Sequence, residues 1–367
     1  MDNKKIRAIG AGILVAVWLV LTGFSWFAPA KESSDAERRP LEQMPEITAE
    51  SLLNGKFMAD FEDYTLDQFP LRDTFRQIKS LFHYNALQQM DNNGIYIADG
   101  YAAKLEYPLN PESVDHAAKR FNDYYNRFLK DAACNVYMAV VPDKGFYLAE
   151  PNGYITMDYE AMFASLQEQM PWAAHIDITD CLSYEDYYRT DTHWRQEKLL
   201  AVAQKLSQAM GVTAPKADDF TVTKVERPFY GVYYGQAALP MESESIYYLR
   251  SDLLDVCKVQ VEFAANTQVY DMTQLDSKDL YDIFLSGAKS YITIENPNAT
   301  TDRELVIIRD SFGSSLAPLL VQDYAKVTLI DIRYQTLENL GRFANYSNCD
   351  VLFLYSTLVL NNSETIQ

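Results

Sequence analysis

The 367-residue sequence predicts an α/β fold, with a parallel β-sheet covered by helices on both faces and one transmembrane helix before it. Short apolar runs in the C-terminal third, separated by segments of helix length, are typical of strands that are buried on both faces. These runs are residues 304–309, 326–332 and 350–355. Hydrophobic residues make up 48% of the chain, which is enough for a large core.

The N-terminus predicts the transmembrane helix. Lys4, Lys5 and Arg7 precede 23 uncharged residues, 8–30, and at ~1.5 Å per residue this run spans a hydrocarbon core of ~30 Å. Because basic residues stay in the cytoplasm, we expect a single-pass protein of the cell membrane with its domain on the extracytoplasmic side. The APA motif at 28–30 also fits a signal-peptidase site, so an uncleaved anchor is favoured but a cleaved signal stays open.

The domain organisation is expected to follow from this anchor. Residues 1–30 form the anchor, and the charged, Pro-containing residues 31–50 form a linker. Residues 51–367 form one α/β domain, into which a partly β segment is inserted at about 216–290.

The elements of the domain are predicted in chain order. Apolar residues at three- and four-residue steps indicate two helices over 51–90, separated at Pro70, and an Asp-Gly turn indicates a hairpin over 95–107. The remaining elements before the C-terminal strands are helices at 111–131, 158–170 and 195–209, and strands at 135–144 and 174–179.

Composition excludes several classes of function. The net charge of −19, with no basic run beyond the N-terminus, argues against nucleic-acid binding. No glycine-rich phosphate loop and no metal-ligand spacing occur in the sequence, so we expect no cofactor and no metal. The four cysteines, Cys134, Cys181, Cys257 and Cys349, lack C-x-x-C spacing, and both disulfides and buried thiols stay open.

Ser311 is the first candidate for chemistry. It follows the apolar run 304–309 and precedes a helix-length segment, so it should lie at the carboxyl end of a sheet strand, where α/β proteins bind ligands. The N-terminus of the following helix offers backbone N–H groups to a developing oxyanion. A serine that merely caps a helix is the alternative explanation.

Asp191 and His193 are the candidate carboxylate and base that would activate a serine nucleophile. A histidine takes the hydroxyl proton, and a carboxylate fixes the tautomer of that histidine. Their two-residue spacing lets the carboxylate turn back to the imidazole ring. The alternative is that Asp191 caps the helix beyond Trp194 while His193 faces solvent.

The motifs TDTHW at 190–194 and DSFG at 310–313, followed by LIDIRY at 329–334, resemble the DHHW family of bacterial envelope proteins. That family is similar to the periplasmic alginate O-acetyltransferases, whose folds are SGNH-hydrolase-like. The similarity also includes FEDYTLDQFPLRDTFRQ at 61–77 and VPDK at 141–144, and extends from about residue 37 to 356.

The resemblance implies a Ser-His-Asp triad in circularly permuted order, with Asp191 and His193 ahead of Ser311. Three positions depart from the pattern of the relatives: Thr192 stands where the family name has His, Ala288 follows Gly287 where Gly-Asn is frequent, and Ser356 stands where Asn is familiar. The oxyanion would then depend on the backbone N–H of Gly287 or of Ser311.

Four further residues are predicted to serve the site. Arg333 and Tyr334 follow the strand 326–332, and an arginine beside an aromatic ring suits a sugar. Lys144 follows the strand that ends near Pro142 and is a similar candidate, as is Trp194. Each has a structural alternative, which for Arg333 is an ion pair with a nearby acid and for Trp194 is a place in the core.

Three functions remain open at this point. The first is a serine O-acetyltransferase that acts on a cell-envelope polysaccharide and receives acetyl groups from a membrane-bound O-acyltransferase, as the resemblance implies. The second is a carbohydrate acetyl esterase of the same fold, in which water is the acceptor. The third is a non-catalytic scaffold that binds polysaccharide through a degenerate site.

Overall fold

The computed structural model describes residues 3–34, 36–262, 264, 268–335, 344 and 346–367. The chain divides into two compact units. The N-terminal unit contains residues 1–92 and 234–240, and the larger unit contains residues 93–233 and 241–367. The boundaries predicted after residues 30 and 50 stay predictions.

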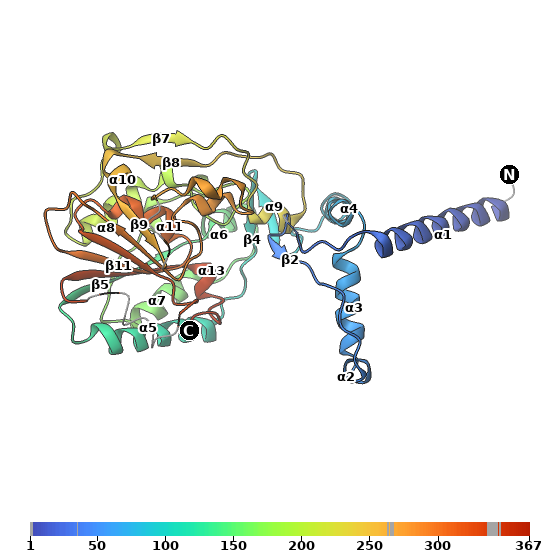
Figure 1. The fold of residues 1–367 in the computed structure, drawn as a ribbon, viewed down its shortest axis with the longest axis horizontal. Helices are drawn as coiled ribbons and strands as arrows, with labels where there is room; N and C mark the ends of the chain where they lie inside the picture. The colour runs from blue at the N-terminus through green and yellow to red at the C-terminus, as the bar shows by residue number, and fades with distance from the viewer. Residues whose placement is uncertain (1–2, 35, 263, 265–267, 336–343, 345) are drawn as a thin grey trace. The chain divides into compact units, whose positions relative to one another are not determined.

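The N-terminal unit is built mainly from helices (Figure 1). Its elements are α1 Asn3–Phe27, β1 Ser33–Ser34, β2 Arg39–Pro40, α2 Ala49–Leu53, α3 Lys56–Asp67 and α4 Arg72–Asn85. The predicted break at Pro70 is confirmed, since it lies between α3 and α4. Within α1, Lys4–Ser25 is long and apolar enough to cross a membrane, which fits an anchor and a signal sequence equally.

The larger unit alternates helices and strands along the chain. Its first half contains β3 Ile95–Ala98, β4 Tyr101–Lys104, α5 Pro111–Tyr124, β5 Cys134–Val141, α6 Lys144–Leu148, α7 Tyr159–Gln169, β6 Ala174–His175, α8 Leu200–Ala209 and β7 Thr221–Lys224. Helix α9 (Val232–Ala237) begins in this unit, and β8 Tyr247–Arg250, α10 Asp252–Val256, β9 Lys258–Val261, β10 Tyr291–Glu295, β11 Glu304–Arg309, α11 Gly313–Leu316, β12 Lys326–Ile330, β13 Cys349–Ser356 and α13 Thr357–Leu360 follow.

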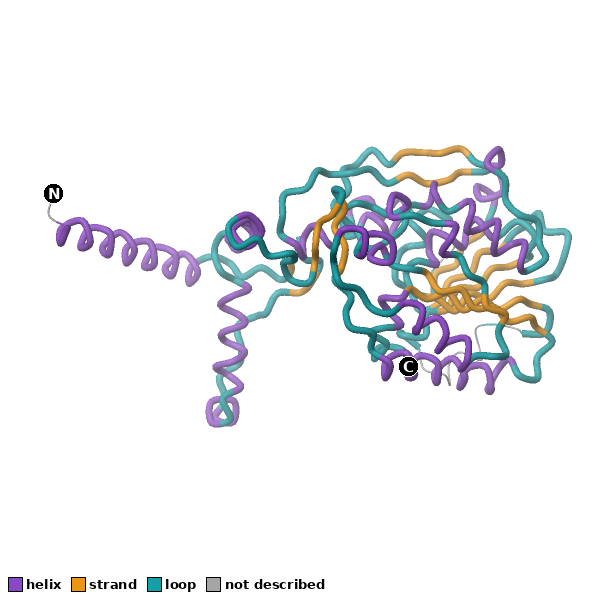
Figure 2. Tube along the Cα trace, turned by 180° about the vertical axis from the view of Figure 1, so that it is seen from behind, coloured by secondary structure: helices purple, strands orange, loops and turns teal. Residues whose placement is uncertain are grey.

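A seven-stranded sheet in the order β6-β5-β13-β11-β12-β10-β9 is the centre of this unit (Figure 2). The strands from β6 to β12 are parallel to their neighbours, β10 is antiparallel to β12, and β9 is antiparallel to β10. The predicted parallel sheet is therefore confirmed for the five strands from β6 to β12, whereas β10 and β9 run antiparallel. Its carboxyl edge carries the ends of β11, β12 and β13 side by side.

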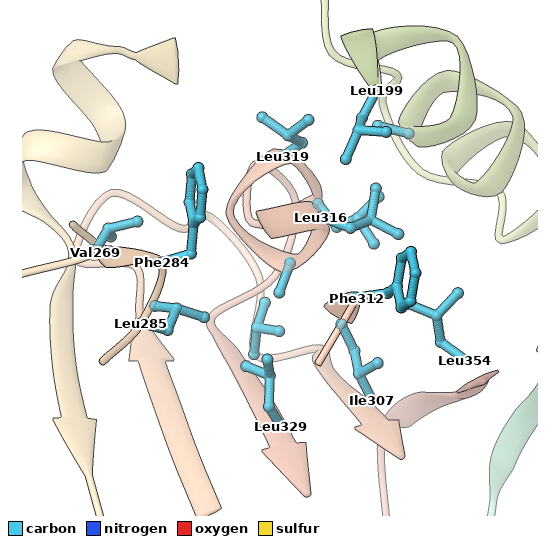
Figure 3. Close-up of a cluster of buried hydrophobic side chains, with 14 of the residues drawn as sticks. Leu199, Val269, Phe284, Leu285, Ile307, Phe312, Leu316, Leu319, Leu329 and Leu354 are labelled. Atoms are coloured by element: carbon cyan, nitrogen blue, oxygen red, sulfur yellow. The ribbon is translucent and has the colours of Figure 1, made fainter. Parts of the chain in front are cut away.

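Helices cover both faces of the sheet, as predicted, because successive side chains of each strand point to opposite faces. On β11, Leu305 and Ile307 belong to a core cluster that also contains residues of α8 and α11. Val306 and Ile308 belong to the cluster on the other face, with residues of α5 and α7. Figure 3 shows the first cluster near the end of β11, where Phe312 and Leu316 pack close to Ile307 and Leu354.

Two elements differ from the sequence-based predictions, and the cysteines, whose state was left open, are settled as thiols. The strand expected at 174–179 is only two residues long, because the Asp177 carboxylate accepts hydrogen bonds from the backbone N–H and the hydroxyl of Thr179 and forms a turn there. Strand β9, inside the expected insertion, joins the main sheet as an edge strand. Its alternating pattern, with Val259 and Val261 buried, is that of a strand covered on one face. All four cysteines are free thiols.

Candidate active site

Asp191, His193 and Ser311 lie in one hydrogen-bonded chain within the larger unit. The Asp191 Oδ1 atom is 2.6 Å from Nδ1 of His193, and Nε2 of His193 is 2.7 Å from the Ser311 hydroxyl. Ser311 directly follows Asp310 at the end of β11, and the other two residues lie in the loop between β6 and α8. Asp191 and His193 are buried, whereas Ser311 is partly exposed, so the chain leads from a buried carboxylate to an accessible hydroxyl.

The Asp191 carboxylate is oriented by backbone N–H groups. Oδ1 accepts the N–H of His193 at 3.0 Å, and Oδ2 accepts the N–H of Val232 at 2.8 Å. Gly231 makes the second contact possible, because a Cβ at this position would lie 2.3 Å from both the Asp191 Cβ and the Thr190 carbonyl oxygen. Only glycine permits this close approach.

Lys144 holds the loop that carries Asp191 through hydrogen bonds to backbone carbonyl oxygens. The Nζ atom donates to the carbonyl oxygens of Ala102, Tyr188 and Asp191, at 2.5, 2.6 and 2.9 Å. Burial lowers the pKa of Lys144 to about 7, against the attraction of Glu244 and other nearby carboxylates. All three donors of the ammonium are used by the protein itself, which makes Lys144 a positioning residue for the loop. Its predicted contact with substrate stays a prediction.

A second support of the same loop comes from Glu244. One carboxylate oxygen accepts the backbone N–H of Arg189, and the other accepts the backbone N–H and the hydroxyl of Thr190, all at 2.9–3.0 Å. The Thr190 hydroxyl in turn accepts the N–H of Gly231 at 2.9 Å. The two segments that meet at Asp191 are thus joined to each other as well as to the carboxylate.

Aromatic rings enclose the imidazole of His193. The Tyr281 ring stacks on it, with centroids 3.9 Å apart and planes 9° from parallel, and the Phe312 ring is tilted at 5.0 Å. The Tyr281 hydroxyl donates to Oγ of Ser315 at 2.7 Å, and Trp194 Nε1 donates to the same oxygen at 2.9 Å. Trp194 is fully buried, so it lies in the core. This position agrees with the structural alternative for Trp194, and its contact with substrate stays a prediction.

The turn at Ser311 is held by the side chain of the preceding residue. The Asp310 carboxylate accepts the N–H of Phe312 at 3.1 Å and the N–H of Ser356 at 2.8 Å. Among the described residues, no group accepts the backbone N–H of Ser311. By contrast, Gly287 donates its N–H to the Phe284 carbonyl at 3.2 Å. Of the two N–H groups considered for an oxyanion, that of Ser311 is the one still available.

Arg333 and Tyr334 follow β12, as predicted. The Arg333 guanidinium forms an ion pair with the buried Asp331, through Nε at 2.9 Å and Nη2 at 2.6 Å. Burial opposes the charge of Arg333, but its hydrogen bonds to Asp331 and their mutual attraction outweigh burial and raise its pKa. The pairing matches the structural alternative for Arg333. Tyr334 is 54% exposed, and a role of either residue in sugar binding stays a prediction.

Sequence reasoning missed several residues that shape the site. Tyr281 lies in a segment without a motif, and its stacking on His193 depends on a tertiary contact. Gly231 was visible as part of the aromatic stretch YGVYYG, where a lone glycine signals close backbone approach, but its partner could not be inferred. Ser356, by contrast, was named from the sequence as a departure from the expected pattern, and its hydroxyl accepts the N–H of Val359 at 3.4 Å and caps α13.

Comparisons with known proteins agree with the motif resemblance. A family model described as DHHW protein matches residues 179–330, which include Asp191, His193 and Ser311. By sequence, no curated protein matches the chain.

Two solved structures have a similar fold over most of the chain, and a third is a weaker match. A DHHW family protein from Eubacterium siraeum has a TM-score of 0.59 at 20% identity, over 75% of this chain and 95% of that one. Bacillus cereus PatB1 with a sulfonyl adduct has a TM-score of 0.59 at 17% identity, over 72% and 95%. The O-acetyltransferase domain of Pseudomonas putida AlgJ has a TM-score of 0.45 at 12% identity, over 73% and 92%. The predicted SGNH-hydrolase-like fold is confirmed, and the chain resembles the DHHW family in sequence between residues 179 and 330 and in fold over three-quarters of its length.

Proposed function

We propose that the protein is a membrane-anchored, extracytoplasmic serine O-acetyltransferase that acts on a cell-envelope polysaccharide. The observation that carries the proposal is the hydrogen-bonded chain from buried Asp191 through His193 to the partly exposed Ser311 hydroxyl, beside an N–H with no acceptor among the described residues. The proposal that acetyl is the transferred group and polysaccharide the acceptor rests on the family resemblance. The proposed membrane anchor is α1.

In the first half-reaction, the Ser311 oxygen attacks the carbonyl carbon of the donor while Nε2 of His193 takes the hydroxyl proton. The backbone N–H of Ser311 donates to the oxyanion that forms, and Asp191 stabilises the imidazolium through Nδ1. The bond to the leaving group then breaks, His193 returns the proton to that group, and acetyl-Ser311 remains.

In the second half-reaction, His193 takes the proton of a sugar hydroxyl, whose oxygen attacks the acetyl carbonyl carbon. The bond to Ser311 breaks, the proton passes to its oxygen, and the acetylated sugar leaves. The acetyl donor has to be delivered on the outer side of the membrane. We therefore propose a membrane-bound O-acyltransferase as the partner that supplies the acetyl group.

The test uses the full chain in detergent with a chromogenic acetyl ester as donor and an envelope oligosaccharide as acceptor. We expect ester turnover, an adduct of one acetyl group by intact mass and acetylated oligosaccharide, all lost in Ser311→Ala. A sulfonyl fluoride should block the same hydroxyl, since such reagents attack activated nucleophiles.

Ser314→Ala is the matched control, because the buried Ser314 hydroxyl has no hydrogen-bond partner among the described residues and its loss should change neither turnover nor adduct. Ester hydrolysis without transfer to any oligosaccharide would favour the esterase. A folded protein with neither turnover nor adduct would contradict the proposal and favour the scaffold.

A further inference from the structure

Helix α4 of the N-terminal unit has its amphipathic pattern reversed relative to a helix of a water-soluble domain. Four large apolar side chains at three- to four-residue steps face outward: Phe75 (44% exposed), Ile78 (56%), Leu81 (39%) and Phe82 (56%). In a soluble protein such a stripe normally faces the core. We call these four residues the α4 apolar face.

The opposite side of α4 is polar and packed. Arg76 donates to the Gly235 carbonyl at 2.8 Å, and the fully buried Ser80 donates to the Ala237 carbonyl at 2.9 Å. Asn92 donates to both the Ser80 hydroxyl and the Ala237 carbonyl, at 2.7 and 2.9 Å. These contacts fix the rotation of the helix, so the α4 apolar face cannot turn inward without breaking buried hydrogen bonds.

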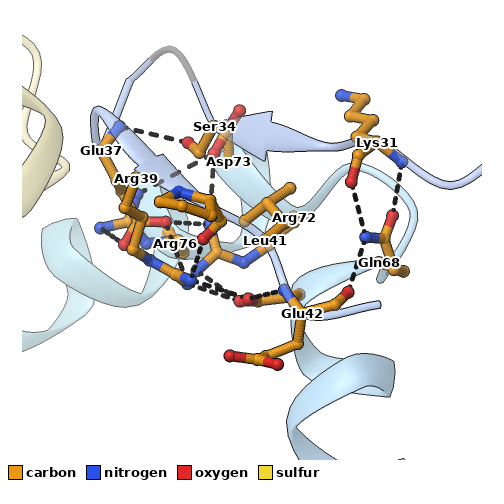
Figure 4. Close-up of polar contacts among 12 residues, drawn as sticks. Lys31, Ser34, Glu37, Arg39, Leu41, Glu42, Gln68, Arg72, Asp73 and Arg76 are labelled. Carbon is orange, nitrogen blue, oxygen red and sulfur yellow. Dashed lines mark hydrogen bonds and ion pairs between the residues drawn. The ribbon is translucent and has the colours of Figure 1, made fainter. Parts of the chain in front are cut away.

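Gln68, the residue that caps the end of α3 and precedes α4, is hydrogen-bonded to the segment that follows α1 (Figure 4). Lys31 and Gln68 exchange two hydrogen bonds, at 2.8 and 2.9 Å. Lys31 is four residues beyond Phe27, the last residue of α1, a separation of at most about 14 Å even for an extended chain. Gln68 is four residues before the first residue of α4, so both ends of this connection are short.

An ion-pair network reinforces this connection, as Figure 4 shows. Arg72 and Arg76 of α4 both pair with Glu37, the latter at 3.2 Å. Asp67, at the end of α3, accepts two hydrogen bonds from Arg39, at 2.7 and 2.5 Å, and the Arg39 bonds hold the pKa of Asp67 below its usual value. The segment 31–42 that follows α1 and the helices α3 and α4 are therefore joined by ion pairs and hydrogen bonds.

We propose that the α4 apolar face inserts into the lipid bilayer surface beside the point where α1 leaves it, so that α4 lies along the membrane as an interfacial helix. The inference rests on the proposed anchoring by α1. Lipid is the occupant favoured by this short, hydrogen-bonded connection to a helix that is itself apolar and has no buried residue in its apolar window. With a net charge of −19, apolar insertion rather than attraction to anionic headgroups supplies the binding.

The test uses the full chain in phosphatidylcholine nanodiscs, with the photoreactive residue p-benzoylphenylalanine in place of Ile78 or Phe82. Mass analysis after irradiation is expected to find phospholipid adducts at both positions. The same residue in place of Leu14 of α1 is the positive control for anchoring. Placed at Asp73, whose side chain on α4 is 55% exposed, it is the matched control and should capture no lipid.

Adducts with a second copy of the chain at positions 78 and 82 would overturn the proposal in favour of a dimer. Lipid capture at Leu14 with none at 78 or 82, or equal capture at Asp73, would also overturn it. Turnover of the acetyl ester by the same samples separates the two proposals, because it needs only groups of the larger unit. Turnover without lipid capture contradicts the α4 inference alone, and capture without turnover contradicts the catalytic proposal alone.

Discussion

The ring of Tyr281 lies flat against the imidazole of His193, 3.9 Å away and 9° from parallel. Its hydroxyl donates to Ser315, which also receives the indole N–H of Trp194. Tyr281 thereby connects the histidine, from the loop before α8, to the first turn after Ser311. Burial raises the pKa of Tyr281, so the phenol stays protonated and keeps donating.

Replacing Tyr281 separates stacking from hydrogen bonding. Tyr281→Leu should lower kcat roughly 10- to 100-fold because the imidazole loses its flat support and its alignment with Ser311. Tyr281→Phe keeps the ring and leaves Ser315 its bond from Trp194, so its kcat should stay close to that of the wild type. Steady-state kinetics on the acetyl ester measure both, and equal losses in the two variants would show that the hydroxyl matters more than the ring.

Asp191→Asn should lower kcat about 10³- to 10⁴-fold with little change in fold, because an amide does not stabilise the imidazolium and favours the wrong tautomer of His193. The measurement is the rate of acetyl-enzyme formation, followed by intact mass. Asp180→Asn removes an equally sized charge from an exposed position, where the carboxylate accepts hydrogen bonds from Lys205 and the Cys181 thiol. An Asp191 variant as active as the Asp180 variant would remove Asp191 from the mechanism.

Gly231→Ala should displace the Asp191 carboxylate, since the added Cβ would lie 2.3 Å from the Asp191 Cβ. We expect a loss of about 1–3 kcal/mol in the free energy of unfolding, from overpacking, and a fall in kcat of at least about 10-fold. Gly211→Ala is the control, because a Cβ there meets nothing within 4 Å although φ is +68°. It should cost some stability and leave kcat unchanged, and a matching loss of kcat in both would contradict the positioning role of Gly231.

Lys144 should make stability depend on pH. Its folded pKa, about 7, is below the 10.5 of an unperturbed lysine, so between these values the unfolded chain binds a proton that the folded chain has released. The contribution of Lys144 to the free energy of unfolding should therefore rise with pH over this window, by up to about 1.4 kcal/mol per pH unit.

Denaturant unfolding of the wild type and Lys144→Met at pH 7, 8 and 9 measures this contribution, because methionine keeps the apolar stem and does not titrate. The stability difference between the two proteins should shift in favour of the wild type as pH increases. A difference that is independent of pH over this window would show that the folded lysine keeps its proton throughout.

Much of the fold could be predicted because it depends on local patterns. Apolar runs at 304–309 and 350–355 became β11 and β13, and the Asp99-Gly100 turn became a hairpin with both residues at positive φ. The early end of the strand at 174–179 was not predicted, because there the Asp177 side chain takes hydrogen bonds from Thr179 in place of strand pairing. The place of β9 in the main sheet also escaped it, since strand order depends on contacts between distant segments.

The sequence by itself predicted the apolar N-terminal run that is long enough to span a membrane, the parallel sheet, and Asp191, His193 and Ser311 as candidate residues, because periodicity and motif spacing are properties of short segments. Tertiary structure alone decided which groups surround them. It brought Gly231 against Asp191 across 40 residues and Tyr281 against His193 across 88 (231 minus 191, 281 minus 193). It also paired the Arg333 guanidinium with the Asp331 carboxylate and exposed the apolar side of α4. These contacts depend on packing, hydrogen bonding and ion pairing between segments that are distant in the sequence, so no local sequence pattern predicts them.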